Sequence, residues 1–197
     1  MKIEGFTQEK ILGPLIFTPN IFEDERGYFF ESWNKKQFLK FTEKSQETFM
    51  QKNEINFVQD NQSFSSKNVL RGLHYQVKPY AQGKLVSCIA GEIFDVVVDL
   101  RKDSPSFGKW AGLVLSGINL KQLWIPEGFA HGFLSLKENT KVLYKTTNYW
   151  NKEAERSLKW NDPLINIKWP LFKLNPIVSK KDSLANSLNK INKDDLF

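Results

Sequence analysis

Two apolar runs meet at a glycine in Lys84-Leu85-Val86-Ser87-Cys88-Ile89-Ala90-Gly91-Glu92-Ile93-Phe94-Asp95-Val96-Val97-Val98-Asp99-Leu100. The second run alternates apolar side chains with carboxylates, so that Phe94, Val96, Val98 and Leu100 oppose Asp95 and Asp99. A period of two is typical of a β-strand, and Ala90-Gly91-Glu92 supplies a turn signal between the runs. The stretch therefore predicts a hairpin of two antiparallel strands.

The same rhythm continues on both sides, with turn signals about every 8 to 12 residues. They are Asp103-Ser104-Pro105, Phe107-Gly108, Ser116-Gly117 and Pro126-Glu127-Gly128. Short apolar runs separated by such turns predict an all-β fold between Phe57 and Trp150, packed as a sandwich or barrel. In the first half, helix is expected only over Asn34 to Lys44, with Asn34 as the N-cap and an apolar stripe formed by Phe38, Leu39 and Phe41.

Length and composition limit the class of protein. A chain of 197 residues suits one compact domain, and a net charge of +6 spread along it favours a small anionic ligand over nucleic acid. The single Cys88 fits a reducing compartment, and no apolar run approaches the roughly 18 residues of a membrane span. We therefore expect a cytoplasmic protein. After Trp169-Pro170 the sequence becomes polar, which predicts a loosely attached segment with a turn or two of helix.

The chain has two histidines, His74 and His131, and each lies near a glycine. Histidine is the usual general base near neutral pH, and a glycine beside a strand residue lets a ligand approach closely. A half-buried histidine bonded to a backbone carbonyl is the simpler reading of either residue alone. A metal site is a further alternative, but it would need Asp95 or Glu92 to complete the ligand set.

Other polar residues have both a structural and a functional reading. Arg26 lies at a turn before an aromatic strand, where it would either clamp a phosphate or remain in solvent. The polar run Gln59-Asp60-Asn61-Gln62-Ser63 fits a strand that lines a polar cavity, or equally an edge strand facing water. Lys84 and Tyr144 fit either a catalytic pair or a surface amine and a packed aromatic ring.

The spacing of Arg71 and His74 raises a problem of geometry. The two residues are an odd number of positions apart, so strict alternation would place their side chains on opposite faces of a strand. A β-bulge at Gly72 would bring both into one site.

Six motifs in order resemble those of the dTDP-4-dehydrorhamnose 3,5-epimerase family. They are Asp24-Glu25-Arg26-Gly27-Tyr28-Phe29, Gln59-Asp60-Asn61, Leu70-Arg71-Gly72-Leu73-His74-Tyr75-Gln76, Pro126-Glu127-Gly128-Phe129-Ala130-His131-Gly132-Phe133, Tyr144-Lys145 and Ser179-Lys180-Lys181-Asp182. The resemblance implies a cupin-like jelly-roll barrel with short helices in a single domain, residues 1–183, followed by a polar tail, residues 184–197.

The resemblance also implies a reaction and the residues that perform it. The family inverts C3 and C5 of dTDP-4-dehydro-6-deoxy-D-glucose in dTDP-L-rhamnose biosynthesis, without metal or cofactor. His74 would be the base, Asp182 its partner and Tyr144 the acid, while Lys84 and His131 would stabilise the enolate oxygen. The remaining implied residues would bind nucleotide or sugar, some of them across a homodimer interface: Arg26, Glu31, Gln59, Asn61, Arg71, Glu155 and Lys181.

Three alternatives remain open at this point. Relatives that epimerise only C3 share much of the motif set, a non-catalytic jelly roll could bind a nucleotide sugar, and a metal-dependent cupin would use the histidines as ligands. One position departs from the family pattern, because Trp150 stands where tyrosine is common.

Overall fold

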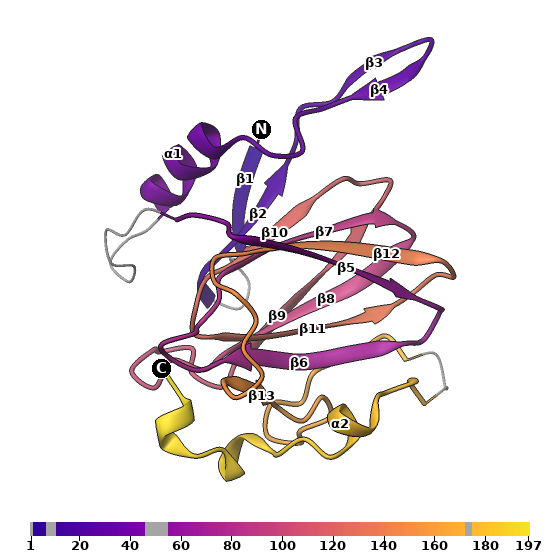
Figure 1. Cartoon of the computed structure of the whole chain (residues 1–197). Coiled ribbons are helices and arrows are strands. Elements are labelled where there is room, and N and C mark those ends of the chain that lie inside the picture. Colours follow the sequence, from indigo (N-terminus) through magenta and orange to yellow (C-terminus); the bar gives the residue numbers. More distant parts are fainter. Residues whose placement is uncertain (1, 7–10, 46–54, 172–174) are drawn as a thin grey trace.

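The computed structural model describes residues 2–6, 11–45, 55–171 and 175–197, and it consists mainly of two antiparallel sheets that face each other (Figure 1). The six-stranded sheet has the order β1 (Lys2–Phe6), β2 (Ile11–Thr18), β10 (Gln122–Ile125), β7 (Lys84–Ala90), β12 (Thr140–Thr146), β5 (Gln59–Ser65). The five-stranded sheet has the order β13 (Glu155–Ser157), β6 (Leu70–Gln76), β11 (Phe129–Ser135), β8 (Glu92–Asp99), β9 (Trp110–Ser116). The predicted all-β fold is confirmed.

The predicted hairpin at Gly91 is wrong. β7 pairs with β10 and β12, whereas β8 pairs with β9 and β11 in the other sheet. Gly91 is the crossing point, with φ at +74°, and a Cβ there would lie 2.8 Å from the Cα of Thr140. Alternation identifies the two faces of a strand, but it does not say which strand lies beside it.

The main core lies between the sheets. It takes inward side chains from both of them, including Val86 and Val142 from the six-stranded sheet and Ile93, Val97 and Phe133 from the five-stranded sheet, all at most 1% exposed. Because successive strand residues point to opposite faces, β8 also presents Val96 and Val98 on its outer face. A second core therefore forms outside the five-stranded sheet.

The C-terminal segment covers this outer face. It contains α2 (Lys180–Ser183) and the short 3-10 helices η1 (Leu188–Lys190) and η2 (Lys193–Asp195). Four of its apolar side chains pack against the second core, namely Leu188, Ile191, Leu196 and Phe197, whereas Leu184 is 72% exposed. The expectation of a loosely attached segment is wrong, because these four packed side chains anchor an otherwise polar stretch on the sheet.

The outer face of the six-stranded sheet is partly covered by α1 (Lys35–Ser45). The predicted N-cap is confirmed, since the backbone N–H of Gln37 donates to Asn34 Oδ1 at 3.1 Å. Phe38 is 2% exposed and its ring contacts those of Phe17 and Trp124 in the sheet. In the described residues no helix is long and apolar enough to cross a membrane.

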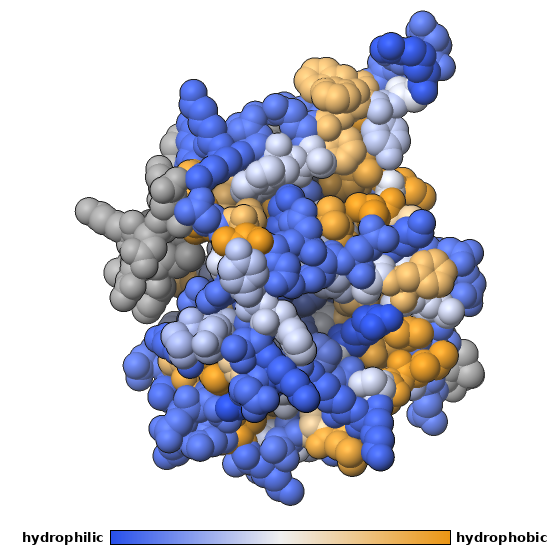
Figure 2. All heavy atoms as spheres, in the orientation of Figure 1, coloured by the Kyte–Doolittle hydropathy of each residue, from blue (hydrophilic) through white to orange (hydrophobic). Residues whose placement is uncertain are grey.

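The strands β3 (Phe22–Asp24) and β4 (Gly27–Phe29) form a hairpin that projects away from the sheets (Figure 1). Its tip is hydrophilic, and apolar side chains gather where the hairpin joins the body (Figure 2). Phe22, Tyr28 and Phe29 are 63%, 58% and 69% exposed. Three large aromatic side chains thus remain uncovered on one projecting element.

Candidate active site

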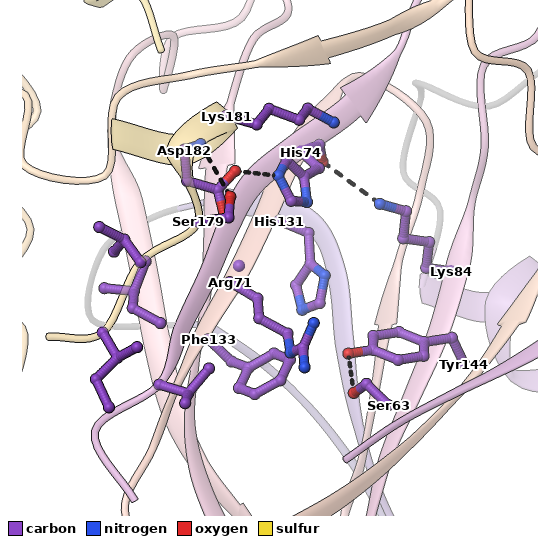
Figure 3. A pocket seen from close by; sticks show the side chains of 15 residues that line it. Ser63, Arg71, His74, Lys84, His131, Phe133, Tyr144, Ser179, Lys181 and Asp182 are labelled. Atoms are coloured by element: carbon purple, nitrogen blue, oxygen red, sulfur yellow. Dashed lines mark hydrogen bonds and ion pairs between the residues drawn. The ribbon is translucent and has the colours of Figure 1, made fainter. Parts of the chain in front are cut away.

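A cavity of about 480 Å³ opens between the two sheets, and the segment before α2 closes one side of it (Figure 3). It is lined by Ser63, Val69, Leu70, Arg71, His74, Lys84, His131, Gly132, Phe133, Tyr144, Ile177, Val178, Ser179, Lys181 and Asp182. Seven of the predicted site residues are in this set: His74, Tyr144, Asp182, Lys84, Arg71, His131 and Lys181.

A bulge in β6 brings Arg71 and His74 into the same cavity, as predicted. His131 pairs with His74 and Phe133 with Arg71, so three steps along β6 match two steps along β11. Gly72 has φ at +119°, and a Cβ there would lie 2.6 Å from the Cα of Gly132. Only glycine fits at this crossing of two backbones.

His74 is paired with Asp182. Its Nε2 lies 2.6 Å from Asp182 Oδ1, and the Gly72 N–H donates to Asp182 Oδ2 at 3.3 Å. Burial raises the pKa of this carboxyl, but the hydrogen bonds from His74 and Gly72 outweigh it and leave the pKa below its usual value. The His74 side chain is 29% exposed, so it is both anchored and open to the cavity.

His131 has an equivalent partner that the sequence pattern does not reveal. Its Nε2 lies 2.7 Å from Oδ1 of Asp95, and the two side chains are 5% and 0% exposed. The sequence suggests Asp95 only as a metal ligand, because the alternation in β8 shows that it points away from Val96 but not that it meets a histidine 36 positions later. Among the described residues, Asp95 Oδ2 has no hydrogen-bond partner.

Tyr144 and Lys84 enter the cavity from the six-stranded sheet, opposite the histidines (Figure 3). The Tyr144 hydroxyl lies 3.0 Å from Ser63 Oγ, a contact that the sequence did not indicate. Burial raises the pKa of Tyr144, and the Ser63 hydrogen bond and the charge of Arg71 only partly oppose this. Burial lowers the pKa of Lys84 to about 8, although Glu155 and Asp95 favour its charged form.

Two further cations lie at the cavity wall and already have partners. Arg71 donates from Nε to Ser65 Oγ at 3.0 Å and from Nη2 to the Phe64 carbonyl at 2.9 Å. Lys181 forms an ion pair with Glu155 at 2.5 Å. Glu155 thus joins the site through Lys181, although it does not itself line the cavity.

Besides Glu155, four predicted binding residues do not line the cavity of their own chain. Gln59 and Asn61 lie on the same strand face as Ser63, and Gln59 Nε2 donates to Asn61 Oδ1 at 2.8 Å. Arg26 lies on the projecting hairpin, 83% exposed and paired with Asp24. Glu31 accepts hydrogen bonds from Asn34 and Gln37 beside α1. The sequence predicts either a cavity-lining strand or an edge strand for the Gln59–Ser63 run. It is both, since β5 is the outermost strand and Ser63 lines the cavity.

The two histidines belong to separate pairs instead of one cluster. Each ring has its own carboxylate, Asp182 for His74 and Asp95 for His131. Within residues 2–6, 11–45, 55–171 and 175–197, no group of three or more His, Cys, Asp or Glu side chains is placed to hold a metal ion.

Known proteins are similar to this chain in sequence and fold. The family model for dTDP-4-dehydrorhamnose 3,5-epimerase matches residues 8–190. The chain belongs to this family. A dTDP-4-dehydrorhamnose 3,5-epimerase from Shigella flexneri is 55% identical over 168 residues, which cover 85% of this chain and 87% of the relative. The expectation of an epimerase is confirmed.

Solved structures extend the comparison to the fold. A dTDP-6-deoxy-D-glucose-3,5-epimerase from Legionella pneumophila, in complex with dTDP-4-keto-L-rhamnose, aligns with a TM-score of 0.87 and 43% identity over 99% of this chain and 97% of that chain. A 3'-monoepimerase from Streptomyces bikiniensis, in complex with dTDP-quinovose, aligns with a TM-score of 0.82 and 28% identity over 91% and 86% of the two chains. The expected jelly-roll architecture is confirmed by these alignments.

Proposed function

We propose that the protein inverts both C3 and C5 of dTDP-4-dehydro-6-deoxy-D-glucose, giving dTDP-4-dehydro-L-rhamnose for dTDP-L-rhamnose biosynthesis. One observation carries the proposal: His74 and Tyr144 extend from facing sheets into the same cavity. A base and an acid on opposite sides of a sugar ring are what inversion by proton transfer requires. The 55% identity to a 3,5-epimerase, against 28% to a 3'-monoepimerase, favours inversion at both carbons.

His74 removes the proton. Asp182 is a carboxylate that accepts from Nε2, so the Nδ1 of the neutral ring is left to take a proton from the carbon next to the C4 ketone. The same carboxylate then stabilises the imidazolium that forms, as in other histidine–aspartate pairs. Asp182 therefore sets both the tautomer and the orientation of the ring.

Loss of the proton places negative charge on the C4 oxygen of the sugar. Lys84 is the cation in the cavity wall on the Tyr144 side, and its ammonium group would stabilise the enolate together with His131. Tyr144 then gives its proton to the opposite face of the same carbon. His74 then releases its proton to solvent and Tyr144 regains one from solvent, and a second round at the other carbon next to the ketone completes the double inversion.

The nucleotide end of the substrate needs cations, and the single chain supplies Arg71 and Lys181 at the cavity wall. Two more of the predicted binding residues, Gln59 and Asn61, continue along β5 beyond Ser63. Trp150, where tyrosine is common in the family, is 55% exposed beside them, and its backbone N–H donates to Gln59 Oε1 at 3.1 Å. A nucleotide along β5 would contact this ring.

We further propose a homodimer in which the projecting hairpin of one protomer completes the site of its partner. Arg26 and its aromatic neighbours Phe22, Tyr28 and Phe29 are exposed on that hairpin, away from the cavity of their own chain. An aromatic and cationic arm fits an anionic nucleotide and an apolar interface.

The buried Cys88 thiol needs no oxidising compartment, which fits an enzyme of the cytoplasm.

Deuterium incorporation from D2O tests the reaction. The enzyme is incubated with dTDP-4-dehydro-6-deoxy-D-glucose in the presence of EDTA, and the label is located by NMR. Label at both C3 and C5, with inversion at each, is the expected result. Label at C3 alone would assign the protein to the monoepimerases, and no label at either carbon would favour a binding module.

Mixing two inactive variants tests the shared site. Arg26→Ala damages the arm, and His74→Ala removes the base. If the arm serves the partner, mixed dimers contain one site with both residues intact, and activity returns to about a quarter of the wild-type value in an equimolar random mixture. No recovery, with dimers confirmed by light scattering, would place Arg26 in its own chain's site.

A further inference from the structure

Ser63 lines the cavity and contacts Tyr144, and the sequence pattern does not predict this contact. Its Oγ lies 3.0 Å from the Tyr144 hydroxyl, and the two side chains point toward each other across neighbouring strands (Figure 3). Ser63 pairs with Val142 and Tyr144 with Asn61, so the hydrogen bond runs diagonally between β5 and β12. Because β5 is the outermost strand of its sheet, this bond attaches an edge strand to the proposed acid.

The direction of the hydrogen bond matters for the chemistry. The tyrosine hydroxyl has one proton, and a proton donated to Ser63 Oγ is not available to a substrate carbon. When Tyr144 acts as an acid, the Ser63 hydroxyl must therefore donate to the phenolic oxygen. Once Tyr144 has given up its proton, the same bond becomes charge-assisted and stronger.

We infer that Ser63 is a positioning residue for the acid step, which aims the Tyr144 proton at the substrate and stabilises the phenolate left behind. The inference rests on the proposed role of Tyr144. Burial disfavours that phenolate, and Ser63 makes the one hydrogen bond that opposes burial at this hydroxyl within the described part of the chain. The positive charge of Arg71 also favours the Tyr144 phenolate.

Ser65, two residues along the same strand, is a matched control. It points to the same side of β5 and is 3% exposed, but its hydroxyl accepts from Arg71 Nε and makes no contact with Tyr144. Ser65→Ala removes an equivalent hydroxyl from the same strand. We expect Ser65→Ala to raise KM through its effect on Arg71. It should not change the fraction of the enolate that goes on to epimerised product.

The experiment measures two quantities in D2O for each variant: the rate of epimerised product and the rate of deuterium entry into unepimerised substrate. In Ser63→Ala, His74 still removes the proton, but the weakened acid lets the enolate return to substrate. The ratio of product to exchanged substrate should fall by roughly 10- to 100-fold, the factor expected for a hydrogen bond to a charged group. Tyr144→Phe should lower the ratio further.

Conservative variants protect the test against a folding defect. Ser63→Thr keeps the hydroxyl and should restore the ratio, whereas Ser63→Cys keeps the volume but has a weak donor and should behave like Ser63→Ala. Equal loss of both rates in Ser63→Cys would assign Ser63 to substrate binding and overturn the inference. A wild-type ratio in Ser63→Ala would overturn it as well.

Failure of the proposed function gives a different result. If wild-type protein exchanges no deuterium at either carbon, the acid and base roles themselves are wrong. If the wild type exchanges and inverts while the Ser63 variants keep its ratio, only the role of Ser63 is lost.

Discussion

The two histidine–carboxylate pairs differ in exposure, which favours a different role for each histidine. His74 is 29% exposed, whereas His131 is 5% exposed, and each carboxylate partner is almost fully buried. A base must reach the carbon that it deprotonates, while a group that polarises an oxygen can act from within the wall. The geometry therefore favours His74 as the base and His131 as the stabilising group.

Replacing Asp182 by asparagine tests the first pair. An amide of the same shape neither fixes the Nε2–H tautomer nor balances an imidazolium, so kcat should fall by about 100- to 10,000-fold with a small change in KM. Initial-rate kinetics measure this. Asp162→Asn is the control, because Asp162 is 1% exposed and accepts from the Leu188 N–H outside the cavity. An equal loss of kcat in both variants would contradict the role of Asp182.

We expect Lys84 to set an upper pH limit for the reaction. Burial lowers its pKa to about 8, so the ammonium that would face the enolate is lost as pH rises through that value. We expect kcat/KM to decline above pH 8 in the wild type and to hold its level to higher pH in Lys84→Arg, which stays charged. Measurement between about pH 6 and 10 decides this, and an unchanged decline in Lys84→Arg would assign it to another group.

The lowered pKa of Lys84 affects stability and activity in opposite directions as pH rises. The pKa of Lys84 is lower in the folded protein than its ordinary value of 10.5, so the unfolded chain binds more protons between about pH 8 and 10.5. The contribution of Lys84 to folding therefore improves as pH rises through this window, while activity declines. Activity loss above pH 8 thus cannot be attributed to unfolding through this residue.

At the scale of elements, the β6 bulge is the feature that makes the site possible. It could be predicted because Arg71 and His74 are three positions apart and both belong to the family motif, with a glycine between them. The structure confirms the bulge and adds its reason, the contact of Gly72 with the Gly132 backbone. Glycines on both strands let β6 and β11 approach beside the cavity.

Gly72→Ala should damage both fold and site. The new Cβ would meet the Gly132 backbone at 2.6 Å, and φ at +119° is unfavourable for any L side chain, so we expect a loss of about 2 to 4 kcal/mol. Urea unfolding followed by fluorescence measures it. Gly5→Ala is the control, since a Cβ at this position would have nothing within 4 Å, and the stability should change by no more than about 0.5 kcal/mol. Equal losses in the two variants would contradict the steric argument at Gly72.

Other elements show where sequence reasoning stops. Strand positions, turns and the Asn34 cap follow from local pattern, because they depend on neighbours in the chain. The partner of a strand does not, which is why local pattern predicts β7 and β8 in one sheet and misses the Asp95–His131 pair. Ser63 is recognisable as part of a polar run, but its contact with Tyr144 depends on the register of β5 against β12.

At the scale of the whole molecule, the cavity is a meeting point of distant segments. Its wall takes residues from both sheets and from the segment leading into α2, while Arg26 projects elsewhere. The net charge of +6 and the cations at the wall suit a diphosphate-linked sugar. The cavity thus holds the proposed binding cations Arg71 and Lys181 beside the residues proposed for proton transfer, while Arg26 lies on the projecting hairpin.

The salt dependence of the kinetics should separate substrate binding from proton transfer. Screening weakens the attraction between exposed cations and a diphosphate, whereas proton transfer inside the cavity is shielded from it. KM should rise by about 3- to 10-fold between low salt and about 0.5 M NaCl, with kcat nearly constant. Steady-state kinetics at several salt concentrations test this, and a parallel fall in kcat would show that salt acts on the chemistry or the fold.

The placement of the proposed base and acid on facing sheets would make the reaction sensitive to the distance between the sheets. Packed sheets generally lie about 10 Å apart. Here side chains such as Val86, Val97 and Phe133 fill the space between the two sheets. The core would thus set the distance across which His74 and Tyr144 exchange protons with the sugar in the proposed mechanism. Hydrostatic pressure, or a trimmed methyl group far from the substrate, would change the turnover rate while the fold stays intact.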